Sequence, residues 1–451
     1  PDLFITSDPD FGNITEWQWK SNTFGDDSIM IPKEMLKLQT YYVKVNAFQT
    51  CTYTIVSSFT KKIRLVNGNP QSGSVAQHMG KYYQMQLNDP LLEEVSFSLS
   101  TTNGRVGMYI STNPDPKSPP EKGKYNSYTW HTDTTKLGVV RILKGSDDHF
   151  CANCTYTILV YGLATNSTSY SLVGFTMDKT IALQEGVSQV GHVNANEFKY
   201  FSFILDAKQA DLSFILTPLS GDPDLYVSIG ARPDSKNSTW KSTDYGADVV
   251  HVDYTTTGYK LGTYFVGVTG YQESQFSLVA KVTDLTNIED SEKRITNLRD
   301  GIPQTGFIAS SDKHVLYKFT PEKSSETVTF SVTPTYGDPD LMVFVNNQTK
   351  PEWKATKWGA DSLTIKGGCD DVHDELCVYT VKVTAFSHTV FSITATAENT
   401  PRMLQAGVPV QDNLDPGETT YFVFNVPNDL DSDLVISITA ISGDPDLYIS
   451  T

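Results

Sequence analysis

The stretch 221–229, Gly221-Asp222-Pro223-Asp224-Leu225-Tyr226-Val227-Ser228-Ile229, joins a tight turn to a strand. Glycine, proline and aspartate are residues that favour turns. After the turn, Leu225, Val227 and Ile229 share one face at the two-residue period of a half-buried strand. Similar short alternating segments separated by turns fill the chain, and no segment shows a helical period. The pattern predicts an all-β fold built from sandwiches of jelly-roll or Greek-key type.

The turn that opens this stretch is repeated along the chain. It recurs at Gly337 and Gly443, a degenerate copy opens at Gly104, and Pro1 begins the tail of a further copy. Recurrence at a long, nearly fixed interval predicts a tandem array of one domain type. Aligning the copies places a C-terminal half-sandwich at 1–60, complete sandwiches at 61–177, 178–284 and 285–397, and an N-terminal half-sandwich at 398–451.

The two half-sandwiches at the ends of the sequence bear on its organisation. A half-sandwich would expose an unpaired sheet edge and half a core. We therefore expect the chain to be a window on a longer repeat polymer, whose partners are further repeats or neighbouring copies. In such an array each domain is expected to contact chiefly its neighbours.

Length, composition and charge restrict the class of protein. The chain has 451 residues, of which 39% are hydrophobic, so it holds enough apolar material for several cores. The formal net charge of −17 argues against nucleic acids and anionic membrane surfaces as partners. No apolar run approaches the ~20 residues that a membrane-spanning helix needs. The sequence therefore predicts no nucleic-acid partner and no membrane span.

The five cysteines indicate the redox environment. Cys151 and Cys154 form one local pair, and Cys369 and Cys377 form another at the same corner of a different repeat. Two such pairs are typical of disulfides that close a loop in an oxidising compartment. A redox-active pair at Cys151 and Cys154 is the less favoured alternative, because no βαβ pattern surrounds it. Cys51 is either a buried thiol or half of an intermolecular bridge.

The order of motifs in the second complete repeat resembles a known family. The turn at 221–227, Trp240, the segment 246–248, the strand 262–271 and the strand 276–278 are similar to the pre-peptidase C-terminal (PPC) domain. The resemblance covers nearly the whole chain and is weakest in 61–177. It implies jelly-roll sandwiches of the kind appended to secreted proteases or found in surface proteins, and some relatives bind calcium or matrix polymers such as collagen. It also implies an extracellular module without catalytic machinery, although no protease segment accompanies the repeats here.

Aspartates gather around the repeated turn, and two interpretations of them remain open. Carboxylates with nearby carbonyl oxygens form the environment that Ca²⁺ prefers. Alternatively, the aspartates accept backbone N–H bonds and only shape the turn. In the degenerate copy Arg105 and Gly107 replace two aspartates, while Tyr125 aligns with Trp240 and Asp133 with Asp248, so 61–177 is the domain expected to lack a metal. The candidate sets are Asp222, Asp224 and Asp248; Asp338, Asp340 and Asp361; Asp2 and Asp27; and Asp444 and Asp446.

Five Asn-x-Ser/Thr triplets are candidate N-glycosylation sites. Three of them fall between the acidic turn and the tryptophan of their repeat, in a loop expected at the surface. Occupied sites would place the protein on a secretory route, so we expect a secreted, extracellular location. The asparagines are Asn13, Asn153, Asn166, Asn237 and Asn347.

No catalytic constellation is visible in the sequence. The eight histidines share no repeat position, and no Gly-x-Ser-x-Gly segment occurs. Trp19, Trp240 and Trp353 repeat in phase, which favours shared packing over sugar stacking. We therefore expect a non-catalytic structural glycoprotein of a fibre, filament or cell-surface stalk. The alternatives are a polymer- or matrix-binding accessory array of a secreted hydrolase, or a Ca²⁺-dependent adhesin.

Overall fold

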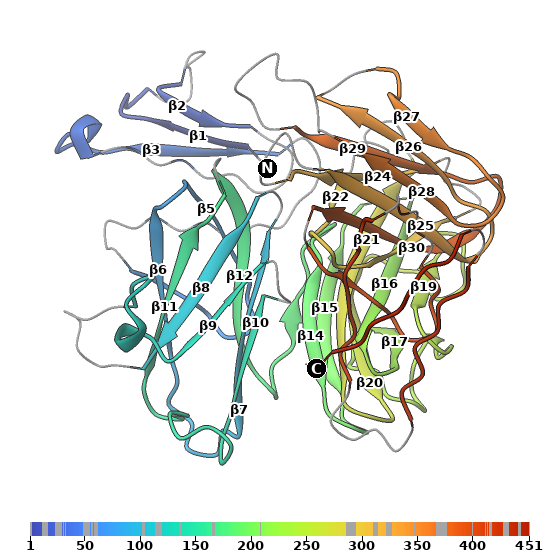
Figure 1. The fold of residues 1–451 in the computed structure, drawn as a ribbon. Helices are drawn as coiled ribbons and strands as arrows, with labels where there is room; N and C mark the ends of the chain where they lie inside the picture. Colours follow the sequence, from blue (N-terminus) through green and yellow to red (C-terminus); the bar gives the residue numbers. More distant parts are fainter. Residues whose placement is uncertain are drawn as a thin grey trace.

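The computed structural model is built almost entirely of β-strands, which confirms the all-β prediction. Figure 1 shows three sandwiches in sequence, the second beside the first and the third packed on the second. The structure describes residues 2–10, 17–22, 29, 31, 33–47, 55, 57, 62–101, 104–112, 120–134, 138–164, 167–207, 209–285, 295–309, 314–321, 327–346, 349–366, 377–398, 400–410, 412, 414, 417–426, 433–440 and 443–450.

The first sandwich pairs a five-stranded sheet of order β4-β6-β11-β8-β9 with a four-stranded sheet of order β10-β7-β12-β5. A short 3-10 helix, Tyr125–Ser127, precedes β9. The strands are β4 (Lys62–Arg64), β5 (Gln71–Val75), β6 (Gly80–Gln86), β7 (Glu94–Thr101), β8 (Val106–Ser111), β9 (Trp130–Asp133), β10 (Val139–Leu143), β11 (Thr155–Gly162) and β12 (Thr168–Thr176).

The second sandwich has the same topology, with sheets β13-β15-β20-β17-β18 and β14-β21-β16-β19. Its strands are β13 (Ile181–Ala182), β14 (Gln189–Val193), β15 (Lys199–Leu205), β16 (Ala210–Ser220), β17 (Pro223–Ile229), β18 (Trp240–Ser242), β19 (Asp248–Val252), β20 (Gly262–Gly270) and β21 (Ser274–Asp284). β17 begins at Pro223, earlier than the sequence predicts, so Gly221 and Asp222 form the end of the turn and Asp224 belongs to the strand.

The third sandwich again has sheets of five and four strands, β22-β24-β29-β26-β27 and β23-β30-β25-β28. Its strands are β22 (Ile295–Asn297), β23 (Gln304–Ile308), β24 (His314–Phe319), β25 (Val328–Tyr336), β26 (Asp340–Val345), β27 (Trp353–Ala355), β28 (Asp361–Ile365), β29 (Tyr379–Thr384) and β30 (Thr389–Ala397). Three sandwiches with one strand order show that a single domain type is repeated.

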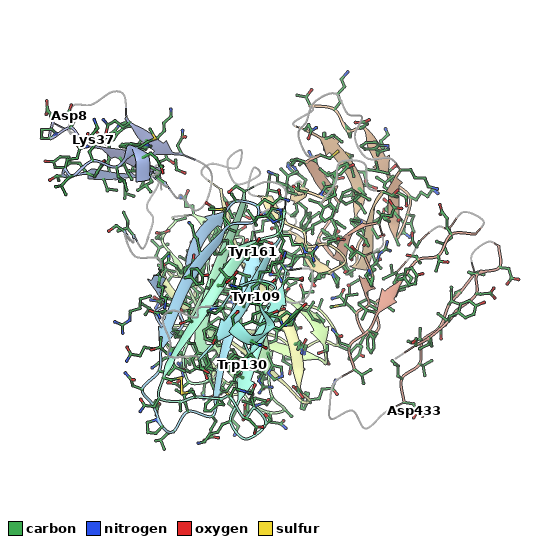
Figure 2. All side chains as sticks on the ribbon, turned by 60° about the vertical axis from the view of Figure 1, so that its left-hand side comes forward. Asp8, Lys37, Tyr109, Trp130, Tyr161 and Asp433 are labelled. Carbon is green, nitrogen blue, oxygen red and sulfur yellow. A yellow bond between two sulfur atoms is a disulfide. The ribbon has the colours of Figure 1, made fainter. Side chains whose placement is uncertain are left out.

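The two ends of the chain hold parts of the same domain. At the N-terminal end, β1 (Asp2–Thr6), β2 (Trp19–Ser21) and β3 (Tyr42–Asn46) form a sheet of order β2-β1-β3, with a 3-10 helix at Lys33–Met35. This sheet, which carries Asp8 and Lys37, extends away from the first sandwich in Figure 2. At the C-terminal end, β31 (Arg402–Met403) and β32 (Phe422–Val423) pair in parallel, as β13 and β15 do.

Each core contains a stack of three aromatic residues, one from each of three strands. A buried tyrosine at the start of β11, β20 or β29 contacts a phenylalanine of the opposite sheet and a tryptophan of β9, β18 or β27. The stacks are Phe97, Tyr156 and Trp130; Phe214, Tyr264 and Trp240; and Phe330, Tyr379 and Trp353. Trp19 contacts Tyr41 in the same way, at 5.8 Å between ring centroids. The in-phase tryptophans therefore pack in their cores.

Successive sandwiches meet through the same elements. The first strand of each four-stranded sheet lies against the central strand of the preceding one, β14 against β7 and β23 against β16. At the first junction Ser100 Oγ donates to the Ser188 carbonyl at 2.6 Å. At the second, the Thr305 amide donates to Thr217 Oγ1 at 2.9 Å, and Phe307 packs on Ile215. The array is therefore a continuous packed body.

Contacts also join units that are two apart in the sequence. Arg299 of the third sandwich donates to Ser100 Oγ of the first at 3.0 Å. Gln405, which follows the third sandwich, donates to the Pro218 carbonyl of the second at 3.0 Å. These are single side-chain hydrogen bonds, whereas the strand packing of β14 on β7 and of β23 on β16 joins neighbouring sandwiches, which remain the chief contacts. The segment that opens each unit therefore also reaches past its neighbour.

Candidate functional site

In the second sandwich, hydrogen bonds of two aspartates hold the acidic turn and the segment between β18 and β19 in place. Asp222 precedes β17, and its Oδ1 accepts a hydrogen bond from the Gly246 amide at 2.7 Å. Asp248 begins β19, and its Oδ1 accepts from Ser242 Oγ at 2.5 Å and from the Asp244 amide at 3.1 Å. The other oxygen of Asp248 is buried and has no hydrogen-bond partner among the residues that the structure describes. The aspartates therefore shape the turns, as one of the two interpretations predicts, but one carboxylate oxygen is left over.

The third sandwich repeats this arrangement. Asp338 Oδ1 accepts from the Gly359 amide at 2.8 Å, and Asp361 Oδ1 accepts from the Lys357 amide at 3.2 Å. Asp361 Oδ2, like its counterpart in the second sandwich, is buried without a hydrogen-bond partner. The same geometry in two sandwiches shows that it belongs to the repeat and is not an accident of one loop.

Burial and like charge raise the pKa values of these carboxyl groups. Burial raises the pKa of Asp248 to about 7, and the charges of Asp224 and Asp244 act in the same direction. The pKa of Asp224 is raised by burial and then by Asp222. In the third sandwich, burial and the charges of Asp340 and Asp338 raise the pKa of Asp361. Each turn thus concentrates negative charge.

The first sandwich has lost the acidic set. Arg105 stands at the place of Asp222, and its Nη2 forms an ion pair with Asp133 Oδ2 at 3.2 Å. The strand register corrects our sequence alignment, because Trp130 pairs with β8 as Trp240 pairs with β17. Trp130, and not Tyr125, is thus the counterpart of Trp240. Asp133 therefore does not correspond to Asp248, whose place is taken by Gly138.

The sets of candidate aspartates near the chain ends are less complete. Asp2 begins β1 and is buried, in the position that Asp224 holds in β17. Its expected companion Asp27 lies outside the described residues. Asp444 and Asp446 are exposed. Within the described ranges, no three His, Cys, Asp or Glu side chains are grouped closely enough to hold a metal ion. Calcium binding at these turns remains a prediction.

Comparisons with known proteins show only limited similarity. No protein-family profile matches the chain, and no curated protein sequence matches it. The chain is similar to the pre-peptidase C-terminal domain of a collagenase from Bacillus anthracis, with 14% identity and a TM-score of 0.18, over 23% of this chain and 92% of that one. It is also similar to dimeric latent PorU from Porphyromonas gingivalis, with 10% identity and a TM-score of 0.14, over 74% of this chain and 33% of that one. At these values neither likeness supports an argument about activity or ligand.

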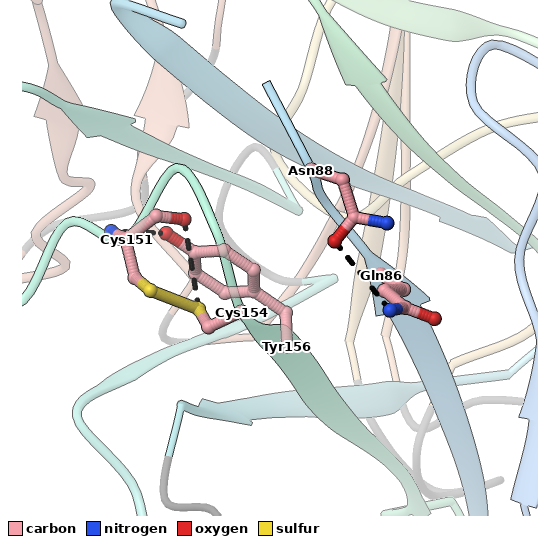
Figure 3. The surroundings of a disulfide bond; sticks show 5 residues. All are labelled: Gln86, Asn88, Cys151, Cys154 and Tyr156. Carbon is pink, nitrogen blue, oxygen red and sulfur yellow. Dashed lines mark hydrogen bonds between the residues drawn. A yellow bond between two sulfur atoms is a disulfide. The ribbon is translucent and has the colours of Figure 1, made fainter. Parts of the chain in front are cut away.

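A disulfide bond joins Cys151 and Cys154, as predicted. It closes the loop before β11, and the Cys151 amide donates to the hydroxyl of Tyr156 at 2.9 Å (Figure 3). This hydroxyl belongs to the core tyrosine, so the loop is tied directly to the aromatic stack of the first sandwich. Cys377, buried at the start of β29, is also disulfide-bonded. Its expected partner Cys369 lies outside the described residues, as does Cys51.

Two of the predicted glycosylation sites can be located. Asn153 lies in the disulfide-closed loop and is exposed. Asn237 is exposed in the loop before β18, where its Nδ2 donates to Asp234 Oδ2 at 3.0 Å. Both positions are open to a glycan. Asn13, Asn166 and Asn347 lie outside the described residues.

Charged and polar residues at the sandwich junctions were missed by sequence reasoning. Arg141 of the first sandwich contacts Glu94 at 2.7 Å and reaches His192 Nε2 of the second at 3.2 Å. His192 in turn contacts Glu273 at 2.6 Å. The residue after a repeated leucine, Gln184, Arg299 or Gln405, is polar in each of these units. That shared polar position was the available signal, but pattern alone does not say which unit it touches.

Proposed function

We propose that the chain is a non-catalytic structural segment of an extracellular glycoprotein. The observation that supports this most is the packing of successive sandwiches through repeated junctions. Domains that work as independent modules are usually joined by exposed linkers and contact each other little. Here the partly buried Arg299 and the buried Gln405 connect units two apart. A bend or pull on one sandwich is therefore transmitted to the next two, which suits a fibre or a stalk.

The extracellular part of the proposal is supported by covalent chemistry. Disulfides persist in oxidising compartments, and Cys151–Cys154 and Cys377 form them. The exposed sequons at Asn153 and Asn237 are accessible acceptors for glycans. None of the helices in the described part of the chain is long and apolar enough to cross a membrane.

Mechanical unfolding of the secreted 451-residue chain tests the structural role. Held in optical tweezers, a packed array is expected to unfold in events that release more than one sandwich together. Separate events, one sandwich at a time and at unrelated forces, would instead indicate independent modules. Glycopeptide mapping of the same material is expected to find glycans at Asn153 and Asn237, and bare asparagines at both positions would contradict the secretory route.

A second candidate function is Ca²⁺-dependent adhesion. It is favoured by the buried oxygens of Asp248 and Asp361 that have no hydrogen-bond partner, because an unsatisfied buried carboxylate is costly unless a ligand or a proton occupies it. Calorimetry of the whole chain with CaCl₂ is the test. Binding that disappears when Asp222→Ala and Asp224→Ala are combined would support a metal at the second sandwich. No heat at millimolar Ca²⁺ would reject it.

A further inference from the structure

Exposed aromatic side chains stand beside each acidic turn. Tyr245 and Tyr271 of the second sandwich expose 72% and 82% of their surface, and Trp358 and Phe386 of the third expose 89% and 97%. Strand register shows that the pairs are equivalent, since Leu225 pairs with Val268 and Leu341 with Val383. Single exposed apolar side chains are common on protein surfaces, but exposed rings that gather beside one another mark interaction sites. Tyr245 lies against Gly407, yet most of its ring stays open.

The turn geometry brings the backbone segments that carry these rings close to the aspartates. Asp222 Oδ1 holds the Gly246 amide at 2.7 Å, which places Tyr245 directly beside the acidic turn. On the other side, a methyl group at Gly270 would lie 3.3 Å from the Asp222 carbonyl oxygen, so the turn that carries Tyr271 passes equally close. Asp222 therefore lies between the two aromatic turns of the second sandwich.

The third sandwich has the same three-part arrangement. Asp338 Oδ1 holds the Gly359 amide at 2.8 Å, next to Trp358. Asp340 pairs with Thr384, two residues before Phe386. We call each combination of the acidic turn with its two exposed rings an acidic-aromatic patch: Asp222, Asp224, Tyr245 and Tyr271 in the second sandwich, and Asp338, Asp340, Trp358 and Phe386 in the third.

Within the described part of the chain, neighbouring carboxylates reinforce the negative charge of these patches. The charges that act on Asp224 and Asp248 are those of other aspartates, and the same is true of Asp340 and Asp361. Asp248 and Asp361 each keep a buried oxygen without a hydrogen-bond partner next to this charge. An assembly of like charges with an unsatisfied carboxylate indicates a site for a positively charged group.

In the first sandwich, both the aspartates and the aromatic residues of the acidic-aromatic patch are replaced. Arg105 and Gly107 take the places of the two turn aspartates, and Gly138 takes that of Asp248. At the positions of Tyr245 and Tyr271 the sequence has Thr135 and Leu163. In the N-terminal repeat, by contrast, Phe24 and Phe48 accompany Asp2 in the sequence. The fold is the same in all, so the shared loss points to one role for the whole set.

The joint absence of aspartates and exposed rings from the first sandwich favours one class of ligand over the others. Turn shaping or a divalent ion would require the carboxylates but not exposed rings. A lysine or arginine side chain uses both, because the carboxylates pair with its charge and the ring faces attract the cation. A second copy of this chain is a poor source of such side chains, given the net charge of −17.

We propose that the two acidic-aromatic patches bind lysine- or arginine-rich segments of a basic partner protein. The patches recur on two successive sandwiches, so one chain offers two sites of the same kind. This inference does not depend on the structural role proposed above, because it concerns an exposed surface of the folded chain.

Fluorescence anisotropy on the whole chain tests the proposal, with a fluorescein-labelled arginine–serine repeat peptide as the probe at physiological salt. The first variant combines Tyr245→Ala, Tyr271→Ala, Trp358→Ala and Phe386→Ala, which leaves the charge unchanged and alters only exposed rings. Loss of these rings is expected to weaken binding about tenfold. A charge control, matched to the aspartate variant below, combines Glu93→Gln with Glu121→Gln, which removes two exposed carboxylates from the first sandwich and is expected to bind like the parent.

A second variant, Asp222→Asn with Asp338→Asn, keeps the acceptors for the Gly246 and Gly359 amides while removing charge, and it is expected to weaken binding as the ring variant does. Thermal melts of all variants check that the sandwiches remain folded. Equal affinity of the ring variant and the parent would overturn the proposal, and so would an equal loss in the control, which would show non-specific attraction to an acidic chain. Ca²⁺ binding that the ring variant retains, without peptide binding by the parent, would assign the turns to a metal.

Discussion

Arg299 Nη2, at the start of the third sandwich, donates a hydrogen bond of 3.0 Å to Ser100 Oγ of the first sandwich. The same nitrogen lies 3.3 Å from the Ser188 carbonyl of the second, so one guanidinium touches all three domains. Burial lowers the pKa of Arg299 to about 10, which leaves it charged at neutral pH. At the equivalent places Gln184 accepts a hydrogen bond from Ser171 Oγ and Gln405 accepts one from Ser392 Oγ. The corresponding serine beside Arg299 is Ser277, whose buried hydroxyl has no hydrogen-bond partner among the described residues.

Two substitutions of Arg299 distinguish the contribution of its charged hydrogen bonds from the effect of giving Ser277 an acceptor. Arg299→Ala is expected to lower the free energy of unfolding by about 2–3 kcal/mol, because it removes charged hydrogen bonds and leaves buried acceptors. Arg299→Gln is expected to cost less, since glutamine can accept from Ser277 as the other repeats do. Urea unfolding measures both. Arg64→Ala, at an exposed position on β4, is the control, and a loss in it as large as that of Arg299→Ala would contradict a specific junction contact.

The junction between the second and third sandwiches depends on Thr217. Its Oγ1 accepts from the Thr305 amide at 2.9 Å and from Gln304 Nε2 at 3.2 Å. Thr217→Val keeps the shape but removes the acceptor, so we expect a loss of about 1–3 kcal/mol and faster amide exchange along β23. Thr329→Val, at a more accessible threonine pair, serves as the comparison. Unchanged exchange along β23 would show that the two sandwiches are held by hydrophobic contact alone.

Stability is expected to depend on pH through Asp248. Its folded-state pKa of about 7 lies above the unfolded value of 3.8, so the protonated carboxyl stabilises the fold. That contribution is fully present below pH 3.8 and is lost as pH rises to about 7. Thermal melts without added ligand should therefore show Asp248→Asn gaining on the parent protein between acidic and neutral pH, by about 4 kcal/mol. A constant difference between the two proteins across this range would refute the pKa assignment.

The local disulfide is expected to contribute modestly. Closing a loop as short as that between Cys151 and Cys154 is worth about 2 kcal/mol in the chain-entropy picture. The double variant Cys151→Ser with Cys154→Ser should therefore melt at a lower temperature while remaining folded. Non-reducing peptide mapping checks the pairing itself, and recovery of free thiols at both positions in secreted protein would contradict it.

The fold class was accessible from sequence because its signals are local. Alternating strands such as 225–229, the turn before them and the in-phase tryptophans depend only on neighbouring residues and on repetition. In the first repeat the sequence match of Tyr125 to Trp240 was wrong, because Trp130 holds that position. The acidic turn is degenerate there, so only the strand register shows which residues correspond.

The sequence by itself determined the all-β repeat, its acidic turns and the disulfide at Cys151–Cys154, since each arises from residues close together in the chain. Only the tertiary structure decided which repeats touch. Arg299 meets Ser100 across 199 positions, because the segment that opens the third sandwich reaches past the second. It also showed that Tyr245 and Tyr271 lie on either side of Asp222, since separate turns converge at the same end of the sandwich. Such contacts follow from packing geometry, which no local pattern encodes.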